Sequence, residues 1–198
     1  MLSTDVYNTL LNRLLNGELP PGTTLNRRQI AEELGVSVAP VLEAFMQLEH
    51  EGFLTTVPRK ETTVRILTKE DIKGNLILKE AIECAAAERY SGETVQMHYA
   101  QLESMAAKLD SHYLNKNSME AWRLDLDFHR ELVALAGYEV LVTEFNKIAV
   151  PNLFYHVNRA LRSDGNMSHV KLLQALSSSN REYAIQELRC HLRSGKIL

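Results

Sequence analysis

The order of periodic segments in the first 66 residues restricts the fold of this chain more than any other feature. Apolar residues recur at helical spacing over residues 6–15, which predicts an amphipathic helix that stops before the turn at residues 20–22. Asn26 is placed to cap a second helix, and Ser37 to cap a third helix running to about His50. Two β-prone runs, residues 53–57 and 62–66, then predict a hairpin. This order is typical of a winged helix-turn-helix, whose third helix can enter a DNA major groove.

The chain changes character at Thr68, which together with Asp71 resembles a capping box at the start of a long helix. Beyond this point no convincing strand pattern occurs, and helices are expected near residues 69–91, 94–111, 118–136, 138–163, 167–177 and 180–194. We therefore predict a mainly α chain with a winged helix-turn-helix at residues 1–67. An all-helical bundle of about six helices is predicted at residues 68–198.

Charge and composition limit the class of protein without identifying it. Residues 1–66 carry six Lys and Arg side chains against eight acidic ones, a net charge of −2, so charge alone does not indicate nucleic-acid binding. No apolar run approaches the roughly 20 residues that cross a bilayer, so we expect no membrane span. Cys84 and Cys190 are too few for a disulfide framework, which favours the reducing cytoplasm as the location.

A specific set of residues in the first domain resembles the GntR family of bacterial regulators. The matching residues, in order, are Leu19-Pro20-Pro21-Gly22, Leu25-Asn26, Ile30 to Ser37, Pro40-Val41, Glu43-Ala44, Leu48-Glu49 and Glu51-Gly52. The helical half is similar to the FCD domain, the ligand-binding domain of the FadR-type branch of that family. The residues that carry this second resemblance are Asp125, Phe128, His129, Leu132, Ser168-His169 and His191. The resemblance implies a transcription regulator, not an enzyme, that acts as a homodimer on double-stranded DNA.

The same resemblance implies a divalent metal held by Asp125, His129, His169 and His191. Asp125 and His129 are four residues apart, so on a helix their side chains share one face. A helical bundle can bring the two later histidines to the same interior point. One carboxylate and three imidazoles suit zinc, nickel, cobalt or manganese. Taken alone, an Asp/His pair at this spacing is more often a solvated helix face or a local hydrogen bond.

We expect the effector to be a small organic acid bound beside the metal. Lys79 stands where relatives often have an arginine, and a lysine attracts a carboxylate as a point charge without the bidentate fork. Arg159 is a second candidate for the effector pocket. The residues expected to contact DNA are Arg28, Ser37, Arg59 and Lys60.

The third helix departs from the family pattern. Relatives commonly have Ser-Arg-Thr-Pro-Val-Arg-Glu-Ala, while this chain has Val38, Ala39 and Leu42 in place of the two arginines and the threonine. Arginine is the usual reader of guanine edges, so three explanations stay open. The protein binds a different operator, using contacts with thymine methyl groups. Alternatively, it binds DNA weakly and depends on dimer avidity, or its winged helix has lost DNA binding and serves a protein partner.

Two other functions compete with a ligand-responsive DNA-binding regulator. A metal with open coordination positions can activate water, which would make the protein a metal-dependent enzyme, although no additional base or substrate-positioning cluster accompanies it. A pure interaction module would have neither metal nor DNA affinity.

Overall fold

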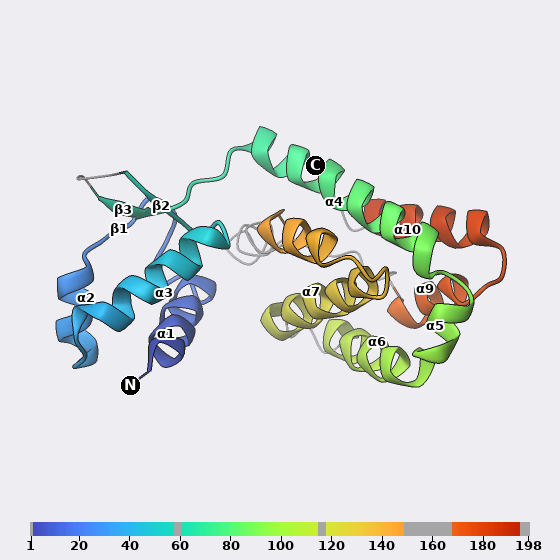
Figure 1. Ribbon diagram of the computed structural model, residues 1–198, viewed down its shortest axis with the longest axis horizontal. Coiled ribbons are helices and arrows are strands. Elements are labelled where there is room, and N and C mark those ends of the chain that lie inside the picture. The colour runs from blue at the N-terminus through green and yellow to red at the C-terminus, as the bar shows by residue number, and fades with distance from the viewer. Residues whose placement is uncertain (1, 58–60, 115–117, 149–167, 195–198) are drawn as a thin grey trace. The chain divides into compact units, whose positions relative to one another are not determined.

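We describe the protein from a computed structural model, which describes residues 2–57, 61–114, 118–148 and 168–194 (Figure 1). The chain forms two compact units. The first extends from the N-terminus to Asp71, and the second begins at Ile72. Each unit has buried apolar side chains of its own.

The first unit has three helices and three short strands in its described residues. They are α1 (Ser3–Leu15), β1 (Thr24–Leu25), α2 (Arg27–Leu34), α3 (Val38–His50), β2 (Leu54–Thr56) and β3 (Thr62–Val64). α1 packs against α3. The side chains that these two helices bury are Val6, Leu10, Leu14, Leu15, Val41, Ala44, Phe45 and Leu48. The three helices predicted from apolar periodicity are therefore confirmed.

The turn between α2 and α3 is set by local side chains. Oδ1 of Asn26 accepts hydrogen bonds from the backbone N–H groups of Arg28 and Gln29, at 2.9 and 3.2 Å, which confirms the predicted cap of α2. α2 ends at Gly35, whose φ of 65° is a left-handed conformation that costs glycine little. Ser37 occupies the N-cap position of α3, but its side chain makes no capping hydrogen bond, so that part of the prediction is wrong.

The strands form a small antiparallel sheet in the order β1-β3-β2. The predicted hairpin is present as β2 and β3, with Thr55 opposite Thr63. Sequence analysis missed β1, which pairs with the other edge of β3 and buries Leu25. A strand of two residues is too short to show the alternation by which strands are recognised.

The second unit is all helical in its described residues. Its helices are α4 (Lys69–Tyr90), α5 (Glu93–Met97), α6 (Tyr99–Leu114), α7 (Ser118–Ala134), a helix over residues 139–148, α9 (His169–Leu176) and α10 (Arg181–Ser194). At the start of α4, Thr68 and Asp71 form the predicted capping box: each backbone N–H donates to the other's side chain, at 2.9 and 3.0 Å. The continuation of the predicted helix 138–163 beyond residue 148 lies outside the described residues.

One predicted helix, 94–111, proves to be two helices. α5 and α6 meet at His98, whose φ of −104° and ψ of 9° lie outside the α-helical region. Neither proline nor glycine occurs at this break, and the apolar periodicity continues across it. The sequence therefore predicts a single helix.

One hydrophobic core holds the second unit together. α6 packs against α7 and α9, and α9 packs against α10. The largest side chains that this core buries completely are Tyr90, Leu102, Leu109, Phe128, Leu132, Phe145 and Leu173. Together the two units confirm the predicted winged helix-turn-helix followed by an all-helical domain. Among the described residues, no helix has the length and apolar character needed to span a membrane.

Candidate functional site

The four side chains predicted to bind a metal come from three helices and meet inside the second unit. Asp125 and His129 lie one turn apart on α7, His169 is the first residue of α9, and His191 lies on α10. One ring nitrogen from each of the three histidines lies within 4.8 Å of the other two. Oδ1 of Asp125 lies 3.1 Å from Nε2 of His169 and 3.9 Å from Nε2 of His129. The structure therefore brings the three histidines together, and Asp125 lies beside two of them.

Two carboxylates outside the predicted ligand set contact two of these imidazoles at Nδ1. Oε2 of Glu83 lies 2.5 Å from Nδ1 of His129, and Oδ1 of Asp110 lies 2.8 Å from Nδ1 of His169. Because an ionised carboxylate only accepts hydrogen bonds, each Nδ1 donates, and each Nε2 is left directed at Asp125. Carboxylates orient metal-binding histidines in proteins in this way.

α6 positions His169 through two side chains. Besides the imidazole, Asp110 accepts hydrogen bonds from Oγ of Ser168 and from the backbone N–H of His169, both at 2.9 Å, which fixes the start of α9. The ring of Tyr113 stacks on that of His169 with an interplanar angle of 4°, and its hydroxyl donates to Asp125 at 3.3 Å. The orientation of His169 thus depends on the packing of α6 against α9.

The carboxylates of the cluster are anionic and one imidazole is neutral. Burial alone would raise the pKa of Glu83, but the charges of His129 and Lys79 hold it at about 2. Burial would also raise the pKa of Asp125, but the hydrogen bond from His169 and the charge of His129 keep it well below its usual range. Burial, together with the neighbouring imidazoles, lowers the pKa of His191 to about 3, so its ring nitrogens include a free lone pair at neutral pH.

His169 carries a proton that a metal ion can replace. Burial alone would lower the pKa of His169, but its hydrogen bonds to Asp110 and Asp125 raise it to about 9. The proton on Nε2 is therefore shared with the carboxylate of Asp125. Metal ligands bind in the deprotonated state, so a cation at this point would take the place of that proton.

The donor set fits a divalent transition metal, and one pair of candidate ligand atoms already has coordination spacing. Zinc–nitrogen bonds of roughly 2 Å separate neighbouring ligand atoms by about 3 Å, close to the distance between Asp125 and His169. One carboxylate with three imidazoles suits the borderline ions zinc, nickel, cobalt and manganese. The assignment of these four residues as ligands stays a prediction.

Lys79 lies beside the cluster, one turn before Glu83 on α4. Its Nζ is 2.5 Å from Oε1 of Glu83 and 5.5 Å from the centre of the Phe145 ring. Only 13% of the Lys79 side chain is exposed. Its charge helps to lower the pKa of both Asp125 and His191. An anion that joins the cluster would therefore meet a partly buried cation.

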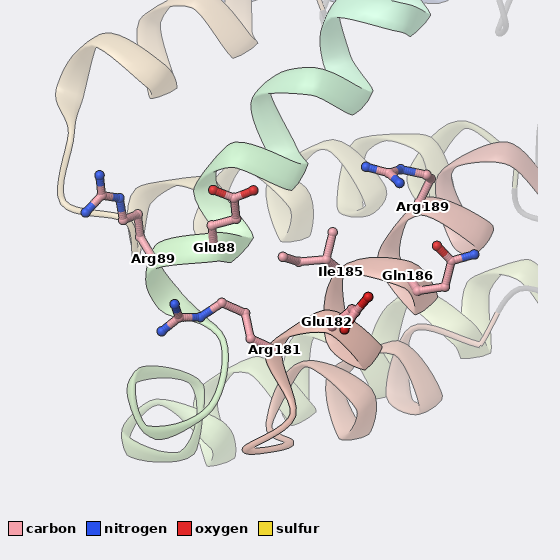
Figure 2. Close-up of a pocket in the computed structure, with 7 residues that line it drawn as sticks. All are labelled: Glu88, Arg89, Arg181, Glu182, Ile185, Gln186 and Arg189. Carbon is pink, nitrogen blue, oxygen red and sulfur yellow. The ribbon is translucent and has the colours of Figure 1, made fainter.

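A separate open groove of about 530 Å³ lies between the end of α4 and the start of α10, and Figure 2 shows its charged side chains arranged around Ile185. Its lining residues are Glu88, Arg89, Arg181, Glu182, Ile185, Gln186 and Arg189. Of the predicted metal and effector residues that the structure describes, none lines it. Small-molecule pockets are mostly apolar with a few polar groups, so this charged groove is a weaker effector candidate than the histidine cluster.

Two of the predicted DNA contacts are exposed at helix N-termini of the first unit. Arg28 lies in the first turn of α2, and Ser37 lies at the N-cap of α3. The neighbouring Arg27 instead donates to Oγ1 of Thr62 at 3.4 Å, so its side chain faces the sheet. The predicted site residues that lie outside the described part of the chain are Arg59, Lys60 and Arg159.

Sequence reasoning missed Glu83, Asp110 and Tyr113. Glu83 had a local signal, because it is a single acid within the otherwise apolar stretch 81–87, four residues after Lys79. Glutamate is almost never fully buried unless it is paired, so an acid at such a position indicates a partner. Asp110 and Tyr113 had no such signal, because their contacts with His169 and Asp125 arise only from helix packing.

Known families match both units. The family described as bacterial regulatory proteins, gntR family, matches residues 2–64, and the FCD domain matches residues 77–194. The HTH-type transcriptional regulator YdhC of Bacillus subtilis is 27% identical over 199 aligned residues, which cover 93% of this chain and 85% of YdhC. The HTH-type transcriptional repressor RspR of Escherichia coli is 25% identical over 139 aligned residues, which cover 70% of this chain and 61% of RspR.

A solved structure of a GntR regulator is also similar to this chain. A GntR regulator from Rhodococcus sp. RHA1 superposes with a TM-score of 0.75 and 25% identity, covering 96% of this chain and 93% of that one. The relatives are transcription regulators and not enzymes, which confirms both the resemblance and the expectation that the protein is no enzyme. The chain therefore belongs to the GntR family of bacterial regulatory proteins, carries an FCD domain, and is a DNA-binding transcription regulator.

Proposed function

We propose that a small organic acid controls this regulator by binding next to a divalent metal ion in the helical domain. Residues 1–67 bind the operator as one half of a cytoplasmic homodimer, and residues 68–198 sense the acid. The observation that carries the proposal is the cluster of Asp125 with three histidines, two of them buried, in which carboxylates fix two of the imidazoles.

Each residue of the cluster has a role in this proposal. A divalent ion supplies positive charge and open coordination positions that a carboxylate can fill. Asp125 and the three histidines hold the ion, and Glu83 and Asp110 keep two of those histidines oriented. Lys79 adds a second positive charge close by, which favours an anionic ligand over a neutral one.

α4 connects the cluster with the DNA-binding domain along the chain. It carries both Lys79 and Glu83, and it is the first helix after the hairpin strand β3. A ligand that alters the contacts of these two residues therefore changes the position of α4. The acid can change operator affinity only by the difference in its own affinity for the two conformations.

Elemental analysis and operator titration of the same purified protein test the proposal. We expect about one divalent ion per chain and one class of carboxylic acid that changes operator affinity only in metal-loaded protein. Chelator-treated protein should bind the operator without responding to the acid. The proposal fails if the protein retains no metal after loading, or if acids act equally with and without chelator.

A further inference from the structure

The outward face of α3 carries a ridge of apolar side chains, formed by Val38, Leu42 and Met46. These residues follow one another at intervals of four, so they lie on the same face of the helix. They are 42%, 39% and 62% exposed, respectively. Ala39 is also exposed and widens the ridge at its N-terminal end.

The packing of α3 forces this ridge outward. The opposite face buries Val41, Ala44, Phe45 and Leu48, and α1 packs against it. Turning Val38 or Leu42 inward would rotate these four side chains into water, which would cost about 1.5–3 kcal/mol for each large one. The apolar ridge is thus a fixed part of the surface.

α3 also lacks the cations that usually contact DNA. Its 13 residues include no Lys or Arg, and its charged side chains are Glu43, Glu49 and, when protonated, His50. Guanine recognition by a bidentate arginine is therefore unavailable from this helix. Phosphate contacts must come from neighbouring groups, such as exposed Arg28 and the backbone N–H groups at the start of α3.

We propose that Val38 and Leu42 select the operator by packing against thymine methyl groups in the major groove. In helix-turn-helix proteins, the first turns of the recognition helix contact base edges in that groove. Phosphates and most base edges are charged or hydrogen-bonding, whereas the thymine methyl is apolar and complements an uncharged ridge. The proposal concerns operator sequence, and it rests on the DNA binding of the family and on neither the metal nor the effector.

The spacing of the ridge gives the expected pattern of thymines. Val38 and Leu42 are one turn apart, about 6 Å along the helix axis. Successive base pairs are about 3.4 Å apart. The two side chains therefore reach methyl groups about two base steps apart within each half-site.

Replacement of thymine by uracil tests this proposal, because uracil lacks only the methyl group. An operator is first selected from random duplex DNA by the full-length, metal-loaded protein, and each thymine is then replaced in turn. We expect uracil at the two contacted positions to weaken binding by about fourfold each, as for the loss of one buried CH₂-sized group. Uracil at the remaining positions should leave affinity unchanged.

A variant of Leu42, with a matched control at another exposed apolar residue, tests whether this side chain contacts one of the methyl groups. Leu42→Ala should weaken binding to the thymine duplex and abolish the effect of uracil at one position, because that methyl has lost its partner. Met97→Ala, a 72% exposed position on α5, is the matched control and should keep the full thymine–uracil difference. Both variants should unfold at the wild-type temperature, since neither side chain is buried.

Equal affinity for the thymine and uracil duplexes at every position would overturn the proposal. So would a Leu42→Ala variant with undiminished uracil sensitivity. A selection that enriches no duplex would also overturn it and would indicate a protein partner for the ridge. Metal content, measured on the same sample, separates these failures from a failure of the effector proposal.

Discussion

Nδ1 of His129 on α7 donates a hydrogen bond to Oε2 of Glu83 on α4, across 2.5 Å and between residues 46 positions apart. Both side chains are buried, with 2% and 1% of their surface exposed. Leaving a buried charge without its partner costs about 3–5 kcal/mol. The orientation of a candidate metal ligand and the position of α4 therefore depend on each other.

Glu83→Gln tests whether this carboxylate supports metal binding. The amide oxygen can still accept from Nδ1, but the negative charge that makes His129 a better ligand is lost. We expect metal affinity to fall by about tenfold to hundredfold, measured by competition with a coloured chelator. Glu80→Gln is the control, because Glu80 lies on the same helix and pairs with Arg193 at the surface. Equal metal affinity in the two variants would contradict the role given to Glu83.

His169→Ala should lower metal occupancy and effector affinity together, because the acid is expected to bind through the metal. The loss of a direct ligand should weaken metal binding by more than about tenfold, the smaller effect seen when only a supporting residue is removed. Elemental analysis and calorimetric titration with the acid measure the two effects. His98→Ala, at an exposed position between α5 and α6, should change neither. Unchanged metal content in His169→Ala would remove this residue from the ligand set.

Lys79→Met separates effector binding from metal binding. Methionine keeps an apolar stem next to Phe145 but removes the cation. A hydrogen bond to a charged group contributes about 1.5–3 kcal/mol, so acid affinity should fall by about tenfold or more while the metal is retained. Lys79→Arg should maintain or increase acid affinity, since a guanidinium can bind a carboxylate with two hydrogen bonds. If the methionine variant loses its metal, Lys79 acts through Glu83 and not on the effector.

Leu48→Ala tests whether the two units fold independently. Leu48 is fully buried in α3, so the cavity should destabilise the winged helix by about 2–5 kcal/mol. Metal binding by the second unit should stay at the wild-type level. Leu132→Ala, at a fully buried position on α7, is the reciprocal variant and should destabilise the helical unit instead. Calorimetry with and without metal should show separate transitions; a single shared transition that moves in both variants would contradict independence.

The helices were predictable where their signals are local. Asn26 and the pair Thr68–Asp71 form the caps expected from their sequence positions, because each cap is closed by hydrogen bonds within three residues. The break at His98 was not predictable, since it depends on backbone angles that no glycine or proline imposes. β1 was missed for a different reason: it is defined by its pairing with β3, about forty residues later in the chain.

The candidate site was predictable only in part. Asp125 and His129 are four residues apart, so their shared face follows from helix geometry. The supporting contacts of Glu83 and Asp110 join residues 46 and 59 positions apart. Neighbouring sequence contains no information on contacts at such separations, which form only when α4 and α6 pack into the core.

The length of α4 places its first residue far from the cluster, so a small tilt near Glu83 displaces that residue by several ångströms. α4 runs unbroken for 22 residues, and only residues 65–68 separate it from β3. The distance from Glu83 back to Lys69 is about 21 Å at 1.5 Å per residue. If the helix stays straight, a tilt of about 10° at Glu83 moves its first residue by about 4 Å. Under the proposed effector response, a small rotation at the cluster would therefore displace the start of α4 by about the height of one base pair.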